Sequence, residues 1–420
     1  MRSARARGAI SGFDALRAIA ALTVVGYHVA LYGGLTRGGW LAPVGSELKD
    51  GVAIFFVISG ALLYLPYARA LNDGSALPGW RAYARRRAVR ILPAYWIALT
   101  AAAIGPFRSG VFGPYAWRYY GLSQIYSPHT LFGGLGVAWS LCTEVSFYLG
   151  LPLFAWCAAR LAGARRGTGA ARVQLTLIGA VGVGSLALRA AVADSPLAPT
   201  QGSTLMVALP GLMDWFAIGM SLGVLRASLE AGDCGSGVIA SLARRAGRCV
   251  LLSLATFAAT LLAQGSDTFL PWCGVVTHLA VGLGSGLLVL SVIAPQPAGG
   301  RPRRRVLGHP VLAWCGTISY GIYLWHLLVL DLLAPRLFPA GRSGSPGQTG
   351  LMLLLVVAGA VACGAVSWYV VERPLQRLSG SQRRSRTGDR SPGRMAEIDG
   401  AVQSTLDPLN SRGVAVDHLA

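Results

Sequence analysis

Apolar stretches long enough to cross a lipid bilayer recur along almost the whole chain. A transmembrane helix needs about 20 consecutive apolar residues. We interpret ten stretches in this way, at about 12–33, 51–70, 89–106, 135–158, 174–193, 204–226, 249–264, 272–294, 310–334 and 349–371. Only 13% of the 420 residues are charged, against about 25% in soluble proteins. The sequence therefore predicts an all-α fold, a polytopic helical bundle of about ten transmembrane helices in the cell membrane.

The basic residues lie in the connections between these stretches. The formal net charge is +20, and arginine clusters precede the first stretch and follow the second, fourth, sixth, eighth and tenth. Connections rich in Arg and Lys stay in the cytoplasm, so this alternation predicts that both termini are cytoplasmic. Because the charge is explained by membrane orientation, we expect the lipid bilayer and no nucleic acid as a partner.

The composition changes near the end of the chain. Residues 1–377 contain all ten stretches and are predicted to form one transmembrane domain, whereas 378–420 is rich in Ser, Arg and Gly. Such a segment cannot bury enough apolar surface to fold, so we expect a disordered cytoplasmic tail. The seven cysteines form no CxxC pair, and their spacing predicts free thiols and no metal site.

The first apolar stretch carries three ionisable side chains, Asp14, Arg17 and His28. Ionisable groups inside a membrane helix are costly and usually functional. Eleven helical steps of about 100° bring His28 to within about 20° of the direction of Arg17, about 16 Å away along the axis. The two side chains therefore share one face. The alternative is an arginine that reaches the lipid headgroups and a histidine satisfied by a neighbouring helix.

The predicted topology converts sequence position into membrane depth. It places Glu144 and His326 in the outer half with His28, and Arg90 near the cytoplasmic end with Arg17. A carboxylate beside a histidine can orient the imidazole and raise its basicity, which suits a general base. A buried Glu–His pair that merely ties two helices together is the alternative.

The stretch 310–334 places three polar side chains on one face if it is a continuous helix. Ser319, Tyr323 and His326 are spaced i, i+4 and i+7, so they line up along the helix. They could donate hydrogen bonds into a cavity. Alternatively, they could join helices, as polar residues often do in membranes.

Several motifs are dispersed from residue 13 to residue 375. They are FDALRAIAALTVVGYH (13–28), GVAIFFVISGALL (51–63), RRAVRILPAYW (86–96), WSLCTEVSFYLGLPLF (139–154), WCGTISYGIYLWH (314–326) and VERPL (371–375). Together and in this order they resemble the membrane acyltransferase-3 family, which includes glycan O-acetylases and macrolide O-acyltransferases. One position departs from the family, because many relatives have an acidic residue where this chain has Ala53. Asp50, three residues earlier, could take that role, or the role could be absent.

The resemblance implies transfer of an acyl group from acyl-CoA, as donor substrate, to a hydroxyl group of a sugar or a secondary metabolite. No bound cofactor is expected. Arg17 and Arg90 would hold the donor, and His28 would act as general base with Glu144 beside it. An acyl-histidine intermediate stays open. Five further residues would support the site: Asp14, Trp139, Ser319, Tyr323 and His326.

Two other classes of function remain open. A multi-span secondary transporter also has polar residues facing the interior of its bundle and a site near mid-membrane. A membrane sensor could use the basic tail as its output. The chemical difference is clear, since a transporter returns its substrate unmodified and an acyltransferase leaves an ester.

Overall fold

The computed structural model describes residues 2–105, 110–193, 195, 199–232, 245–264, 272–293, 307–338 and 344–378. Across these ranges the regular structure is helical, with no strand. Residues 1–372 form one compact unit, and a second begins at Arg373. The predicted tail, 378–420, lies outside the described residues except for Leu378.

Long apolar helices account for most of the first unit. They are α1 (Arg2–Tyr32), α3 (Gly51–Asp73), α4 (Trp80–Ile104), α6 (Ala138–Ala162), α7 (Gly167–Ala193), α9 (Leu209–Ala231), α11 (Ala246–Gln264), α12 (Trp272–Ile293) and α15 (Pro346–Ser367). Within the described ranges, nine helices are long and apolar enough to cross a membrane, and a bent pair gives up to ten. The predicted all-helical bundle of about ten spans is confirmed.

Shorter helices fill the connections. They are α2 (Ala42–Glu47), η1 (Leu48–Asp50), α5 (Ala116–Tyr120), η2 (Gln124–Tyr126) and α8 (Pro199–Val207), and the π-helical η3 (Trp368–Glu372) follows α15. α2 and η1 pack against α1 just before α3 begins. The short elements therefore pack onto the long helices that they join.

The stretch 310–334 is not the continuous helix that the sequence predicted. It is broken at Ile318 into α13 (Pro310–Thr317) and α14 (Ser319–Leu337), which meet at 72°. The Ser319 hydroxyl donates a hydrogen bond of 2.8 Å back to the Gly316 carbonyl at this break. Because Gly316 has no side chain, α13 can lie directly against the backbone of Asp14 in α1. The break places Ser319 in the first turn of α14.

Glycines allow α3 to pack closely against α9. A Cβ atom at Gly60 would meet the backbone of Phe216, and one at Gly219 would meet the backbone of Val57. Membrane helices associate through such small residues because their backbones can then approach closely. α3 also contacts α1, α6, α7 and α12, so it lies at the centre of the bundle.

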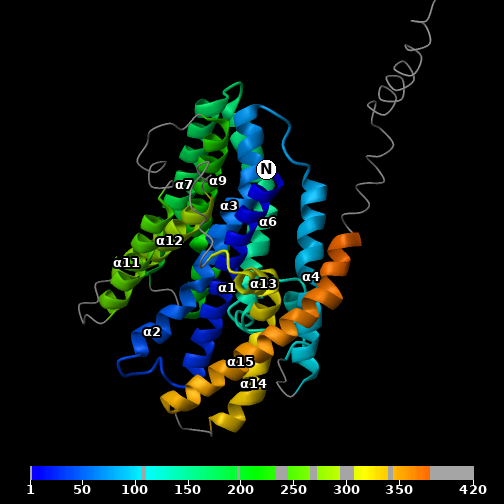
Figure 1. Ribbon diagram of the computed structural model, residues 1–420, viewed down its shortest axis with the longest axis vertical. Helices are drawn as coiled ribbons and strands as arrows, with labels where there is room; N and C mark the ends of the chain where they lie inside the picture. The colour runs from blue at the N-terminus through cyan, green and yellow to red at the C-terminus, as the bar shows by residue number, and fades with distance from the viewer. Residues whose placement is uncertain are drawn as a thin grey trace, which may run out of the picture. The chain divides into compact units, whose positions relative to one another are not determined.

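α14 and α15 lie side by side next to α1 (Figure 1). Gly321 and Gly364 bring the two backbones together. An apolar cluster that includes Val25, Ile322 and Val356 joins these helices to α1. α1 therefore lies between α3 on one side and α14 with α15 on the other, and this arrangement positions Arg17 and His28.

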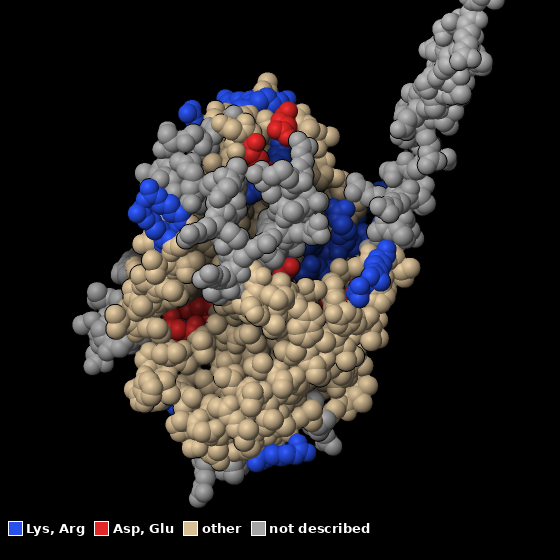
Figure 2. Space-filling model, viewed as in Figure 1, with Lys and Arg blue, Asp and Glu red and all other residues tan. Residues whose placement is uncertain are grey.

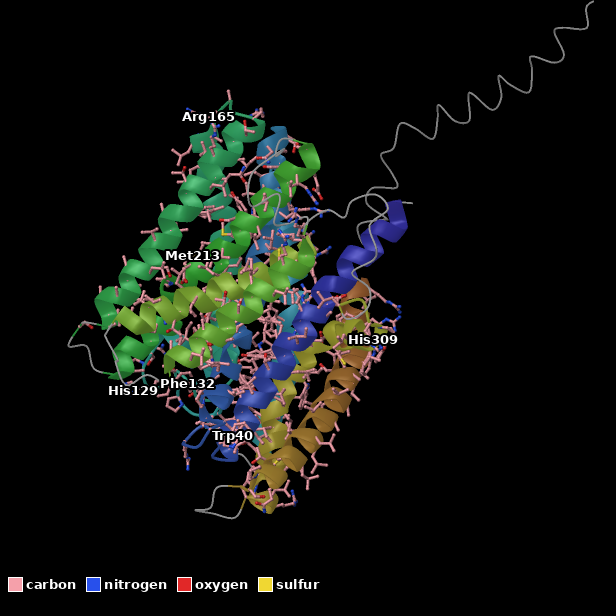
Figure 3. The ribbon with its side chains drawn as sticks, turned by 60° about the vertical axis from the view of Figure 1, so that its left-hand side comes forward. Trp40, His129, Phe132, Arg165, Met213 and His309 are labelled. Carbon is pink, nitrogen blue, oxygen red and sulfur yellow. The ribbon has the colours of Figure 1, made fainter. Side chains whose placement is uncertain are left out.

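The two ends of the bundle differ in charge. In Figure 3, Arg165 lies at one end, and Trp40, His129 and Phe132 lie at the other. In Figure 2, Lys and Arg gather mainly toward the upper end of the view, and uncharged residues cover most of the lower part. We call the end with the α6–α7 connection (163–166) the arginine-rich end. That this end faces the cytoplasm stays a prediction.

Candidate active site

A cavity of about 190 Å³ lies inside the bundle between α1, α3, α4, α6 and α14. Its walls mix apolar side chains with a concentrated set of polar ones. The polar lining residues are Arg17, Ser59, Arg87, Arg90, Ser140, Glu144, Tyr148, Ser319, Tyr320 and Tyr323. Five predicted site residues therefore meet at one cavity, although they come from four different helices.

Three arginines face this cavity. Arg17 forms an ion pair of 3.1 Å with Asp14, one turn earlier on α1. Arg90 and Arg87 lie one turn apart on α4, and the Arg87 guanidinium lies 5.8 Å from the centre of the Tyr148 ring. Guanidinium groups bind phosphate oxygens through pairs of parallel hydrogen bonds. The cluster is thus suited to a phosphorylated ligand.

A second cavity, of about 280 Å³, shares Arg17 and Leu62 with the first. It lies toward the arginine-rich end, and its other polar lining residues are Asp14, Arg69 and Arg226. Arg69 and Arg226 both contact the Glu230 carboxylate, at 2.8 and 2.6 Å. The rest of the lining is apolar. Arg17 therefore lies at the boundary between the two cavities.

Glu144 accepts two short hydrogen bonds from side chains of the first cavity. The Ser59 hydroxyl donates at 2.5 Å and the Tyr148 hydroxyl at 2.6 Å. The sequence led us to expect this carboxylate beside an imidazole. The hydrogen bonds that the structure gives it are instead to these two hydroxyl groups.

His28 and His326 are paired with each other. The His326 Nε2 atom lies 3.2 Å from His28 Nδ1, and the ring centres are 5.0 Å apart. Neither imidazole is among the residues lining the two cavities. Tyr323 connects the two regions, because it lines the first cavity and its ring lies 5.9 Å from the ring of His326. His326 is fully buried and His28 is half-buried.

The remaining predicted residues take different positions. Ser319 and Tyr323 both line the first cavity, where the Tyr323 hydroxyl is 2.7 Å from the Ser140 hydroxyl. Trp139 packs edge-on against Phe56, with ring centres 6.4 Å apart, and lines neither cavity.

Asp50 does not replace the acidic residue that many relatives have at the position of Ala53. Ala53 is fully buried, and the Asp50 side chain lies beside Glu47 and Lys49 at the η1 helix. Asp50 lines neither cavity. The acidic group that many relatives have at this position is therefore not replaced by Asp50 within the two cavities.

Sequence reasoning missed several lining residues, including Ser59, Arg87, Tyr148 and Tyr320. Two of them had a signal in the sequence. Arg87 is three residues before Arg90 and Tyr148 is four residues after Glu144, and such spacings share a helix face. Ser59 and Tyr320 carried no comparable signal.

Glu372 was also missed, and it lies close to Arg90 of α4. It is 3% exposed, accepts a 3.2 Å hydrogen bond from Ser367 and interacts electrostatically with Arg90. It ends η3, a π-helical turn that packs against α4. Such π-helical turns are frequent at functional sites.

Comparisons with known proteins identify the family of the chain. Residues 10–370 match a family model, Acyl_transf_3, described as an acyltransferase domain. YrhL of Bacillus subtilis (strain 168), provisionally named a peptidoglycan O-acetyltransferase, is 25% identical over 87% of this chain, which spans 55% of that protein's length. Nodulation protein 10 of Rhizobium leguminosarum bv. viciae is 25% identical, over 88% of this chain and 94% of that protein.

Acyltransferase MdmB of Streptomyces mycarofaciens is 26% identical, over 88% of this chain and 92% of its own length. No solved structure matches the chain. The family model spans every residue that lines the two cavities. The chain therefore belongs to the acyltransferase-3 family, and the protein is a multi-pass membrane acyltransferase.

Proposed function

We propose that the protein transfers an acyl group from acyl-CoA to a hydroxyl group of a sugar or a secondary metabolite, with His28 as the general base. One observation carries this proposal. Three arginines converge on a cavity whose wall, at Tyr323, adjoins the His28–His326 pair. An arginine-lined cavity and a pair of imidazoles thus lie in neighbouring parts of one bundle, which supports the proposal.

The donor suits this arrangement because it is anionic at one end and thin at the other. The phosphates of CoA would be held by Arg17, Arg87 and Arg90. The second cavity would give access to Arg17 from the arginine-rich end. The distance of about 16 Å from Arg17 to His28 along α1 is comparable to the length of the arm that carries the thioester.

The chemistry needs one proton transfer in each direction. The acceptor hydroxyl gives its proton to His28 as its oxygen attacks the thioester carbonyl carbon. The C–S bond then breaks, and the departing thiolate takes the proton back from the His28 imidazolium. The products are an ester and free CoA. The hydroxyl groups of Ser319 and Tyr323, on the cavity wall, would stabilise the developing oxyanion.

The name of one relative supports the proposed class of acceptor. The name of the Bacillus relative refers to peptidoglycan, which contains sugar hydroxyls. Secondary transport is not favoured, since the family is one of acyltransferases.

Mass spectrometry of cell extracts tests the proposal. Cells that express the protein should contain a metabolite or glycan fragment heavier by one acyl group, and cells without it should not. His28→Ala should abolish this gain while the amount of protein in the membrane stays unchanged. His309→Ala is the matched control, because His309 is exposed at the start of α13. Normal acylation by the His28→Ala variant would remove His28 as the base.

A further inference from the structure

The hydrogen bonds of the two imidazoles determine where their protons lie. A carbonyl oxygen can only accept a hydrogen bond, so a ring nitrogen that bonds to it must carry hydrogen. His326 Nδ1 lies 2.8 Å from the Tyr323 carbonyl, and His28 Nδ1 lies 2.9 Å from the Val24 carbonyl. Both rings therefore carry hydrogen on Nδ1.

This leaves a lone pair on Nε2 of each neutral ring. The Nε2 atom of His326 faces Nδ1 of His28 at 3.2 Å. It can therefore accept the same N–H group that His28 shares with the Val24 carbonyl. His28 Nε2 is left as the atom with an available lone pair.

We propose that His326 is a positioning residue that, together with the Val24 carbonyl, holds His28 in the orientation and tautomer in which its Nε2 atom is the base. His326 accepts the Nδ1–H group of His28, and it stabilises the imidazolium formed when Nε2 takes the acceptor's proton. A carboxylate has this role in a Ser-His-Asp triad. Here a second imidazole takes the place in which the sequence led us to expect Glu144. This inference rests on the proposed role of His28.

His326 acts through His28 rather than on the substrate. Its side chain is fully buried, and both of its nitrogens are engaged, one by the Tyr323 carbonyl and the other by His28. No nitrogen of His326 is left for a substrate hydroxyl. His28 is half-buried, and the structure gives its Nε2 atom no hydrogen bond.

The contact between α1 and α14 does not depend on the histidine pair alone. The Tyr32 hydroxyl donates a hydrogen bond of 2.6 Å to Asp331, farther along the same two helices. Val25 and Val29 of α1 pack with Ile322 and Leu330 of α14. Substitutions at His326 that preserve its size should therefore leave the two helices packed.

The first test measures the tautomers directly and does not require activity. The full-length protein, labelled with ¹⁵N-histidine and placed in lipid bilayers, gives distinct nitrogen signals for protonated and unprotonated ring atoms. Spectra of the His28→Gln and His326→Gln variants identify the two residues. We expect hydrogen on Nδ1 and a lone pair on Nε2 in both rings. A hydrogen on Nε2 of His28 would overturn the proposal, whether or not the proposed function holds.

The second test compares two amide substitutions at His326. The amide oxygen of His326→Gln lies near the position of Nε2 and can accept from His28. The shorter side chain of His326→Asn places its amide near Nδ1, where it can still reach the Tyr323 carbonyl but not His28. CoA release from acetyl-CoA is measured with purified protein and an extract in which the wild type produces the acylated product.

We expect His326→Asn to lower kcat about 10²-fold. General acid–base catalysis typically contributes about 10²- to 10⁴-fold, and this value is the lower end of that range. The KM for acetyl-CoA should stay unchanged, because the arginine cavity is intact. His326→Gln should keep a kcat close to that of the wild type. Equal kcat values for the two variants, or an effect on KM alone, would show that His326 only joins helices and would overturn the proposal.

Discussion

At the scale of single residues, sequence spacing predicts which side chains share a helix face, but it does not predict which side chains meet between helices. The shared helix face of Arg17 and His28 could be predicted from their spacing. The layer predicted for Glu144 could not, because Glu144 lines the cavity of Arg17 and Arg90, which His28 does not line. The partner of His28 could not, because depth says nothing about how neighbouring helices are rotated. His326 faces His28 across the α1–α14 contact, and Glu144 is bonded to hydroxyls of α3 and its own helix.

Arg17 is the residue where donor binding can be tested most simply. It lines both cavities and is held by Asp14. A hydrogen bond to a charged group contributes about 1.5–3 kcal/mol, so Arg17→Gln should raise the KM for acyl-CoA by roughly 10- to 100-fold. The dependence of the rate on acyl-CoA concentration gives this value.

The matched control for Arg17 is Arg165→Gln, which removes one positive charge from the α6–α7 connection. The Arg165 guanidinium is bonded to the backbone carbonyl groups of Leu161 and Ala162 and lines neither cavity. This variant should bind the donor as the wild type does. Unchanged donor dependence in Arg17→Gln would remove Arg17 from the donor site.

At the scale of helices, hydropathy predicted the positions of the spans but not the break at Ile318. The stretch from Pro310 to Leu337 is apolar almost throughout, and its prolines lie near its two ends. The break depends on how α13 packs against α1 at Gly316. A contact between residues 14 and 316 leaves no periodic pattern in the chain.

Adding even one methyl group at Gly316 should therefore destabilise the protein. A Cβ atom there would meet the backbone of Asp14, which cannot yield as a flexible side chain can. Overpacking of this kind costs about 1–3 kcal/mol, so Gly316→Ala should lower the thermal unfolding temperature of the protein in detergent. Gly150→Ala is the control, because a Cβ atom at Gly150 of α6 meets nothing within 4 Å. Equal unfolding temperatures for the two variants would contradict the close α1–α13 contact.

At the scale of the whole molecule, the alternation of arginine clusters predicts which end of the bundle is cytoplasmic. Arg165 lies at one end and His129 at the other (Figure 3). Arginine-rich connections stay inside, so the donor side of the two cavities would face the compartment that contains acyl-CoA.

Cysteine labelling of intact cells tests this orientation. With an impermeant thiol reagent, His129→Cys should be labelled above the wild-type level before the cells are opened. Arg165→Cys should be labelled above that level only afterwards. The reverse pattern would invert the predicted topology and place the arginine cavity's entrance on the outer side.

The central claim is that an anionic donor is held at the arginines while its thioester reaches the imidazole pair. It is tested most directly by a structure of the protein with an acyl-CoA analogue whose thioester sulfur is replaced by a methylene group. We predict phosphate groups against Arg17, Arg87 and Arg90 and the acyl carbonyl beside Nε2 of His28. An analogue bound with its carbonyl remote from His28, or with its phosphates away from these arginines, would contradict the account.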